Sequence, residues 1–277
     1  MTAIALALAA SIAWGLGDYL GGFMSRRLHV LTVLAVSQVV GFVAVLAWAA
    51  LSGDGFPGWE AAGWAVAAGV GGCVGLASLY RGMAVGAMAI VAPISAVSAA
   101  IPFIVGVASG ERPSALQLVG VALALAGVAL ASREPPELGG GRAAGVGLAL
   151  LAAAGFGAYY VFLDQAADEG VAWAVATARG TSSLLAISAA LLVGVTLRPG
   201  ARVFPIVAAV GLCDVGANVL VGLALTRGYL SVVSVLASLY PVVTVALASV
   251  LLRERIARPQ LVGVTGALTG AALITAG

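Results

Sequence analysis

The chain of 277 residues is 62% hydrophobic and only 9% charged, with a mean hydropathy of +1.14. A soluble domain carries roughly a quarter charged residues, so this chain has too few to cover a water-facing surface and is predicted to be an integral membrane protein. The net charge of +2 is small and dispersed, which gives no indication of a nucleic-acid partner.

The apolar segments predict a bundle of spanning helices. Each span needs roughly 20 mostly apolar residues. Barrel strands alternate in polarity and run about ten residues, which these segments do not. The connecting stretches are too short for a soluble domain. The predicted fold class is therefore an all-α integral membrane protein with ten transmembrane helices, at residues 3–24, 30–51, 61–81, 86–108, 115–132, 143–163, 171–195, 203–226, 230–252 and 259–276.

The two halves of the chain repeat each other. The sequence QLVGV occurs at 117–121 and again at 260–264, and Glu111 and Glu254 precede the last helix of each copy, where helix N-terminal charge complementarity explains them. An odd number of spans per copy places the second copy upside down, and inverted repeats are typical of secondary transporters. The predicted organisation is a first five-helix repeat at 1–132, a linker at 133–142 and a second five-helix repeat at 143–277.

Several motifs carry a family resemblance. They are WG at 14–15, GERPSALQLVGVALALAGV at 110–128 and the long segment from ALTRGYLS to TGAAL at 224–273. With the five-plus-five repeat, they make the chain resemble the drug/metabolite transporter superfamily, in its ten-span EamA-like branch. The resemblance implies a solute path lined by spans 1–4 and 6–9. It also implies transport of small solutes, among which amino acids, sugars, nucleotides and drugs are all represented. Arg253 departs from the Gly-Glu-Arg pattern in the second copy.

Two arguments about orientation disagree. The resemblance implies that both termini lie in the cytoplasm. Ten arginines fall in loops on the opposite side of the membrane, against only Arg112 and Arg227 on the side of the termini. The positive-inside rule places the arginine-rich side in the cytoplasm, so both orientations stay open.

Asp214 lies near the middle of the predicted span 203–226, within GLCDVGANVL. A charge at that depth costs at least a few kcal/mol, so it should face protein or water rather than lipid. Asn218 lies one helical turn further on, on the same face. Two roles stay open. Asp214 either takes up a proton or contacts a cationic group during transport, or it joins two helices through hydrogen bonds.

Two further charges lie inside predicted spans. Arg179, about two turns into span 7, is a candidate counter-ion of Asp214 or anchor for a substrate carboxylate. A structural ion pair, or an arginine that extends toward the surface, explains it equally. Asp18, in the outer third of span 1, is a candidate for solute or proton binding. The alternative is a helix-end acid near water, or a partner of Arg26 and Arg27.

Aromatic and amide side chains are candidate walls of a solute path. Trp14 and Phe156 occupy repeat-related positions, and Tyr159 could present its hydroxyl to a solute. Ordinary packing or an interfacial aromatic belt is the alternative. Gln38 is a polar group in an apolar segment, where contact between helices and contact with a ligand stay open.

Three prolines are candidate hinges. Pro93 and Pro102 fall in span 4 and Pro241 falls in span 9. Each removes a backbone hydrogen bond and frees a carbonyl group. Because these spans are equivalent in the two repeats, the kinks could be paired bending points of two gates. Static kinks are the alternative.

An enzymatic interpretation is considered because residues 15–18 match the GxGD signature of intramembrane aspartyl proteases. Asp18 and Asp214 would then share a proton. The Tyr-Asp motif that should precede this signature and the later Pro-Ala-Leu motif are both missing. No metal-binding, phosphate-binding or cofactor motif occurs, so we expect no enzymatic activity, no cofactor and no metal.

The sequence as a whole predicts a secondary active transporter in a multi-pass cell-membrane location, expected to be a bacterial inner membrane. It would move a small amino acid-like, sugar-like or drug-like metabolite by alternating access, with proton coupling at Asp214 as the mechanistic hypothesis. Its expected partners are the solute and the lipid bilayer. The alternative is a non-transporting membrane scaffold or helper subunit. The sequence names neither the solute, the direction, the coupling ion nor the oligomeric state.

Overall fold

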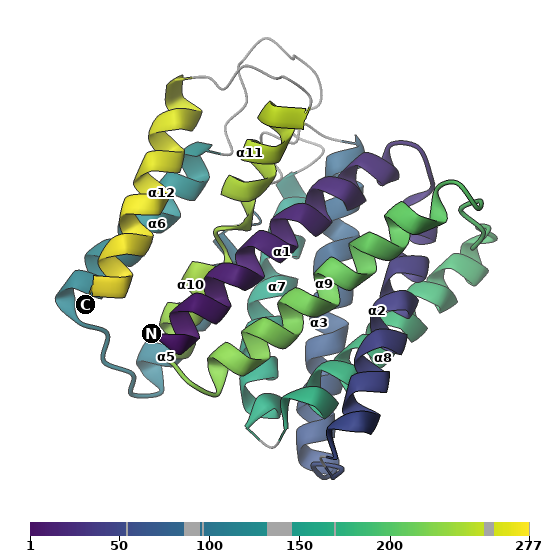
Figure 1. Ribbon diagram of the computed structural model, residues 1–277, viewed down its shortest axis with the longest axis horizontal. Helices are drawn as coiled ribbons and strands as arrows, with labels where there is room; N and C mark the ends of the chain where they lie inside the picture. Colours follow the sequence, from purple (N-terminus) through teal and green to yellow (C-terminus); the bar gives the residue numbers. More distant parts are fainter. Residues whose placement is uncertain are drawn as a thin grey trace.

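The protein is a bundle of helices packed side by side (Figure 1). A computed structural model describes residues 1–53, 55–85, 95, 97–131, 146–168, 170–251 and 258–276. Within these ranges there is no β-strand. The all-α fold class is therefore confirmed.

The first half supplies three long helices and three shorter elements. Predicted spans 1, 2, 3 and 5 match helices to within a few residues. Span 4 is described only in its second part, and Pro93 lies outside the described residues. The elements are α1 (Thr2–Ser25), α2 (Val30–Ser52), α3 (Trp59–Val85), the 3₁₀ turn η1 (Val97–Ala99), α5 (Ala100–Ala108) and α6 (Ala115–Ala131).

The second half follows the same order of elements. Predicted spans 6, 7, 8 and 10 again match single helices, whereas predicted span 9 is divided into two. The elements are α7 (Val146–Ala167), α8 (Val171–Val193), α9 (Phe204–Leu225), α10 (Leu230–Ala237), α11 (Tyr240–Leu251) and α12 (Arg258–Ala276).

Within the described residues, six helices are long and apolar enough to cross a membrane, namely α1, α2, α3, α7, α8 and α9. The described parts of the other apolar segments, around α5, α6, α10–α11 and α12, are shorter than a full span. A typical bilayer core needs roughly 20 residues of helix. The six long helices establish a multi-pass membrane protein, and the count of ten spans stays a prediction.

The break in the ninth predicted span has a local cause. Helix α10 ends at Ala237 and, after a two-residue turn, α11 begins at Tyr240. Pro241 lacks the N–H group that would bond the carbonyl of Ala237, four residues earlier. Pro102 stands in the same relation to Ser98, which lies in the turn η1 before α5. Both prolines therefore lie beside a helix interruption, and their hinge role stays a prediction.

Helices of the two halves pack against each other in reciprocal pairs. Helix α1 packs against α9, and α3 packs against α7. Helix α2 packs against α8, and α6 packs against α12 at one edge of the bundle (Figure 1). The core of the protein therefore lies between the halves.

Small residues allow these pairs to approach closely. A Cβ atom on Gly155 would lie only 2.6 Å from the carbonyl oxygen of Gly71, where α7 crosses α3. A Cβ atom on Gly270 would lie 2.6 Å from the carbonyl oxygen of Gly120, where α12 crosses α6. Lipid supplies little hydrophobic drive for association between helices, so close packing of small residues is a main source of their affinity.

Glu111 caps a different helix from the one predicted. Its carboxylate accepts backbone N–H bonds from Leu230 at 2.7 Å and Ser231 at 3.0 Å, at the start of α10. The N-terminus of α6 is instead capped reciprocally by Ser114 and Gln117. The electrostatic reason for the charge was right, but the interaction joins the first half to the second.

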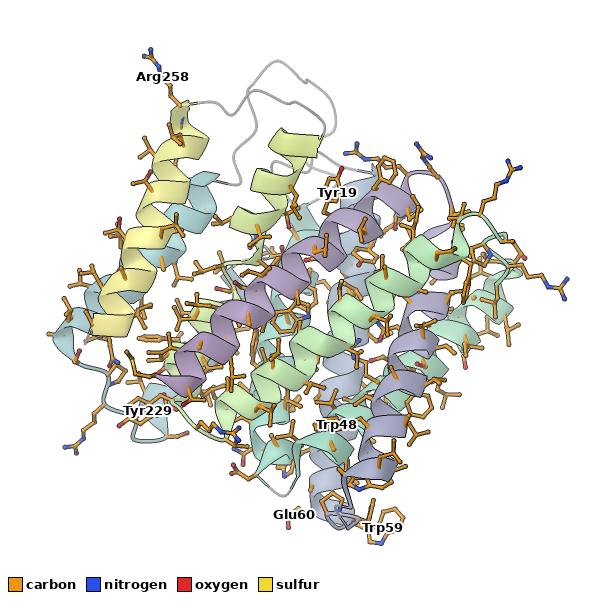
Figure 2. All side chains as sticks on the ribbon, in the orientation of Figure 1. Tyr19, Trp48, Trp59, Glu60, Tyr229 and Arg258 are labelled. Carbon is orange, nitrogen blue, oxygen red and sulfur yellow. The ribbon has the colours of Figure 1, made fainter. Side chains whose placement is uncertain are left out.

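Both termini lie at the same side of the bundle (Figure 1). Figure 2 shows Trp48, Trp59 and Tyr229 at the ends of helices on this side and Arg258 at the opposite end. Trp59 and Tyr229 are exposed, and aromatic side chains of this kind concentrate where a membrane meets water. These residues therefore mark one interfacial rim.

Candidate functional site

Helix α9 positions the central acid of the site. Asp214 and Asn218 lie one turn apart on one face, as their spacing predicts. Gly211 lies one turn earlier, and a Cβ atom there would collide with the backbone oxygen of Ser37 on α2. The glycine thus lets α2 and α9 approach so closely that Gln38 reaches the carboxylate of Asp214.

Asp214 forms an ion pair with Arg179, which extends from α8. The guanidinium Nη1 lies 2.6 Å from Oδ2 of the carboxylate, and Nη2 lies 3.2 Å from Oδ1. The two side chains are 9% and 13% exposed. A bidentate arrangement of this kind is among the stronger charge-assisted interactions in proteins. This ion pair fits both the counter-ion role and the structural role predicted for Arg179.

The first half of the chain completes the surroundings of this pair. Trp14 on α1 donates its indole N–H to Oδ1 of Asp214 at 3.0 Å. Gln38 on α2 donates its amide to Oδ2 at 3.1 Å and accepts Nη1 of Arg179 at 2.5 Å. Because carboxylates only accept and guanidinium groups only donate, the Gln38 amide satisfies both neighbours in this orientation.

A second set of hydrogen bonds extends the network to α7. The hydroxyl of Tyr159 donates to Oδ1 of Asn218. The amide of Asn218 donates to the Asp214 backbone carbonyl at 2.5 Å and to Oδ1 at 3.1 Å. Four helices, α1, α2, α8 and α9, therefore contact one carboxylate, and α7 joins the same network through Asn218. Satisfied networks of this kind rigidify the place where they occur.

The network lines part of a pocket between the two halves. All six residues predicted to bind solute or proton line it, namely Trp14, Asp18, Tyr159, Arg179, Asp214 and Asn218. The predicted hinges Pro102 and Pro241 do not line it, although the neighbouring Ser98 and Tyr240 do.

The rest of the lining is largely apolar and aromatic. It includes Leu76 and Gly72 from α3 and Phe156 from α7. The rings of Trp14 and Tyr160 meet edge to face at a centroid distance of 5.9 Å. Gly72, which sequence reasoning missed, precedes Asp214 by 142 residues, the spacing that relates Trp14 to Phe156. That spacing was the signal that could have found it.

Asp18 lies in the pocket rather than at a wet helix end. Asp18 is only 9% exposed. Two flanking glycines explain the burial. A Cβ atom on Gly17 would lie 3.4 Å from Cβ of Cys213 on α9, and one on Gly21 would collide with the hydroxyl of Tyr80 on α3. The alternative of an acid near water is therefore wrong.

The geometry also bears on the chemistry open to the two acids. A shared proton requires a hydrogen bond between carboxyl groups. In the part of the chain that the structure describes, no hydrogen bond joins Asp18 to Asp214, and Asp214 is paired with Arg179 instead. Over the same residues, no three His, Cys, Asp or Glu side chains are grouped closely enough to hold a metal ion.

Comparison with known proteins adds a family and a fold. The sequence model of the EamA-like transporter family matches residues 1–133 and 143–276. A search of curated proteins found no significant match. A solved structure described only as the crystal structure of a protein is 17% identical, with a TM-score of 0.80 over 99% of this chain and 96% of its own. At that identity the likeness shows a shared fold.

Proposed function

Because the chain belongs to the EamA-like transporter family, we propose that it is a secondary carrier that moves a small solute through the pocket between its two halves. The observation that carries the proposal is the placement of this pocket. A carrier site is expected at the interface of two halves, near the middle of the membrane. Here charged and aromatic side chains from both halves line one cavity.

An inverted repeat is part of the proposal. Exchanging the two halves maps the α1–α9 pair onto the α7–α3 pair, and it maps α2–α8 and α6–α12 onto themselves. The separate family matches at 1–133 and 143–276 support the same division. A two-fold axis in the membrane plane would make the inward-open and outward-open states structurally equivalent, which is the basis of alternating access.

The packing between halves is suited to such a movement. The pairs α1–α9 and α3–α7 contact each other at small residues such as Gly17, Gly71 and Gly155. Few large side chains interdigitate at these contacts, so the helices can tilt without repacking many of them. The interruptions beside Pro102 and Pro241 provide candidate bending points. In this mechanism the Asp214 network holds α1, α2, α7, α8 and α9 in register at the level of the pocket.

The test is transport by the purified protein in proteoliposomes. The solutes are a panel of amino acids, sugars, nucleosides and organic cations. Leu76→Trp would fill the pocket, because Leu76 is buried in its lining. Leu192→Trp is the matched control on the exposed end of α8. We expect saturable uptake of at least one solute, its loss in Leu76→Trp and its retention in the control.

Two results would contradict this proposal in different ways. Uptake of no solute in the panel by folded protein would favour the scaffold or helper subunit. Unchanged uptake in Leu76→Trp would keep the carrier but contradict a solute path through this pocket. Proton coupling at Asp214 has its own test. Asp214→Asn removes the carboxylate that would carry the proton, so it should abolish the pH dependence of uptake. Fully preserved pH-dependent uptake in that variant would contradict the hypothesis.

A further inference from the structure

One acid in the pocket has no partner among the residues that the structure describes. Asp18 is about nine-tenths buried and lines the cavity. Among residues in the described ranges, no side chain or backbone group donates a hydrogen bond to its carboxylate, and no cation pairs with it. A buried carboxylate in this position costs free energy unless something positive joins it.

The groups that face Asp18 cannot supply that charge. Tyr80 on α3, Tyr160 on α7, Tyr240 on α11 and Asp214 on α9 are its electrostatic neighbours, and none of them is a cation. Of the described residues that line the pocket, Arg179 alone is positive. Its guanidinium is committed to Asp214 through both Nη atoms. Counted with both acids ionised, the described lining carries one negative charge in excess.

The rest of the cavity is suited to an apolar body. The rings of Trp14, Phe156, Tyr159, Tyr160 and Tyr240 line it. Aromatic faces attract cations electrostatically and also bury hydrocarbon surface. Trp14 lies one turn before Asp18 on the same helix, so a ring and a carboxylate are presented together.

We propose that Asp18 binds the positively charged nitrogen of the solute, so that the substrates of this carrier are organic cations with an aromatic or other apolar body. The proposal rests on the proposed carrier function and names the substrate class of the same pocket. Recognition then has two parts. The excess negative charge selects the cation, and the aromatic wall selects the body. The Asp214–Arg179 pair contributes a fixed polar wall and no net charge.

Equilibrium binding to the purified full-length protein tests this assignment. The cationic probes are phenethylammonium and tetraphenylphosphonium, and the matched probes are neutral 2-phenylethanol and anionic 3-phenylpropionate. We expect at least one cation to bind saturably, with phenethylammonium at least about tenfold tighter than 2-phenylethanol. Asp18→Asn should abolish this preference, and Asp18→Glu should retain it in part. Glu60→Gln, at an exposed position at the start of α3, removes the same charge outside the pocket and should change nothing.

The outcomes separate the two proposals. Failure of both cations to bind folded wild-type protein would overturn the cation site, as would a preference that survives in folded Asp18→Asn. Uptake of neutral or anionic solutes that is independent of Asp18 would keep the carrier and overturn the cation site. Cation binding that depends on Asp18, with no flux of any solute in proteoliposomes, would keep the site and overturn the carrier.

Discussion

Two aspartates line one pocket, and their surroundings are opposite. Asp214 accepts hydrogen bonds from Arg179, Trp14 and Gln38 as well as from its own helix. Asp18 receives none from the residues that the structure describes. The same residue type can therefore organise a site at one position and remain available to a ligand at another position in the same pocket. What decides between these roles is the set of donors that the neighbouring helices provide.

The largest expected effect on the free energy of unfolding comes from removing the cation that pairs with Asp214, which leaves this acid unpaired like Asp18. Arg179→Ala would leave the carboxylate of Asp214 buried without its cation. Removing one partner of a buried pair typically costs about 3–5 kcal/mol, and we expect a loss of that size in the free energy of unfolding, measured in mixed detergent micelles. Arg227→Ala, at an exposed position, is the matched control and should change stability by less than about 0.5 kcal/mol. A stable Arg179→Ala protein would show that the pair is not what organises the site.

A double-mutant cycle sharpens the same point. In Arg179→Ala with Asp214→Ala, the uncompensated charge is gone. We expect the double variant to be about 1–3 kcal/mol more stable than the sum of the two single losses predicts. The unfolding free energies of the four proteins give this coupling directly. Additive losses would mean that the two side chains stabilise the bundle independently of each other.

A smaller effect should follow from removing one donor. Trp14→Phe keeps a ring against Tyr160 but removes the N–H that bonds Asp214 at 3.0 Å. A hydrogen bond to a charged group contributes about 1.5–3 kcal/mol, so we expect a loss in the lower part of that range in the unfolding free energy. Trp48→Phe, a partly exposed tryptophan at the rim, is the control. Equal losses in both variants would assign the effect to ring packing.

The sequence gives part of this site and not the rest, for physical reasons. That Asp214 and Asn218 lie next to each other on one helix face follows from their spacing of four residues alone. The Arg179 partnership was one of several alternatives, because spacing along the chain does not reveal how α8 faces α9. The indole bond from Trp14 joins residues 200 positions apart. It depends on the register of α1 against α9, which no local pattern encodes.

The fold, too, could be predicted from the sequence only in part. Apolar length placed most helices to within a few residues, because burial in lipid imposes that length. The interruption before Pro241 was predicted only as a kink, since the missing N–H acts on a carbonyl one turn earlier. For Asp18 a role in the site and a role at a wet helix end both stayed open, because the sequence gives depth along α1 but not which helices cover that depth. Close contacts at Gly17 and Gly21 bring α9 and α3 over it.

The smallest expected effect is a slight gain in stability rather than a loss, and it tests the difference between Asp18 and Asp214 most directly. Asp18→Asn removes a buried charge that has no protein partner, so the substitution removes a desolvation cost without breaking a bond. We expect the ligand-free variant to be as stable as wild type or more stable by up to about 1 kcal/mol in the same unfolding measurement. Asp214→Asn, the same chemical change in the same cavity, should be destabilising because the guanidinium of Arg179 then loses its counter-ion. If both variants lose stability equally, Asp18 has a structural partner, and the distinction between an organising acid and an available acid fails.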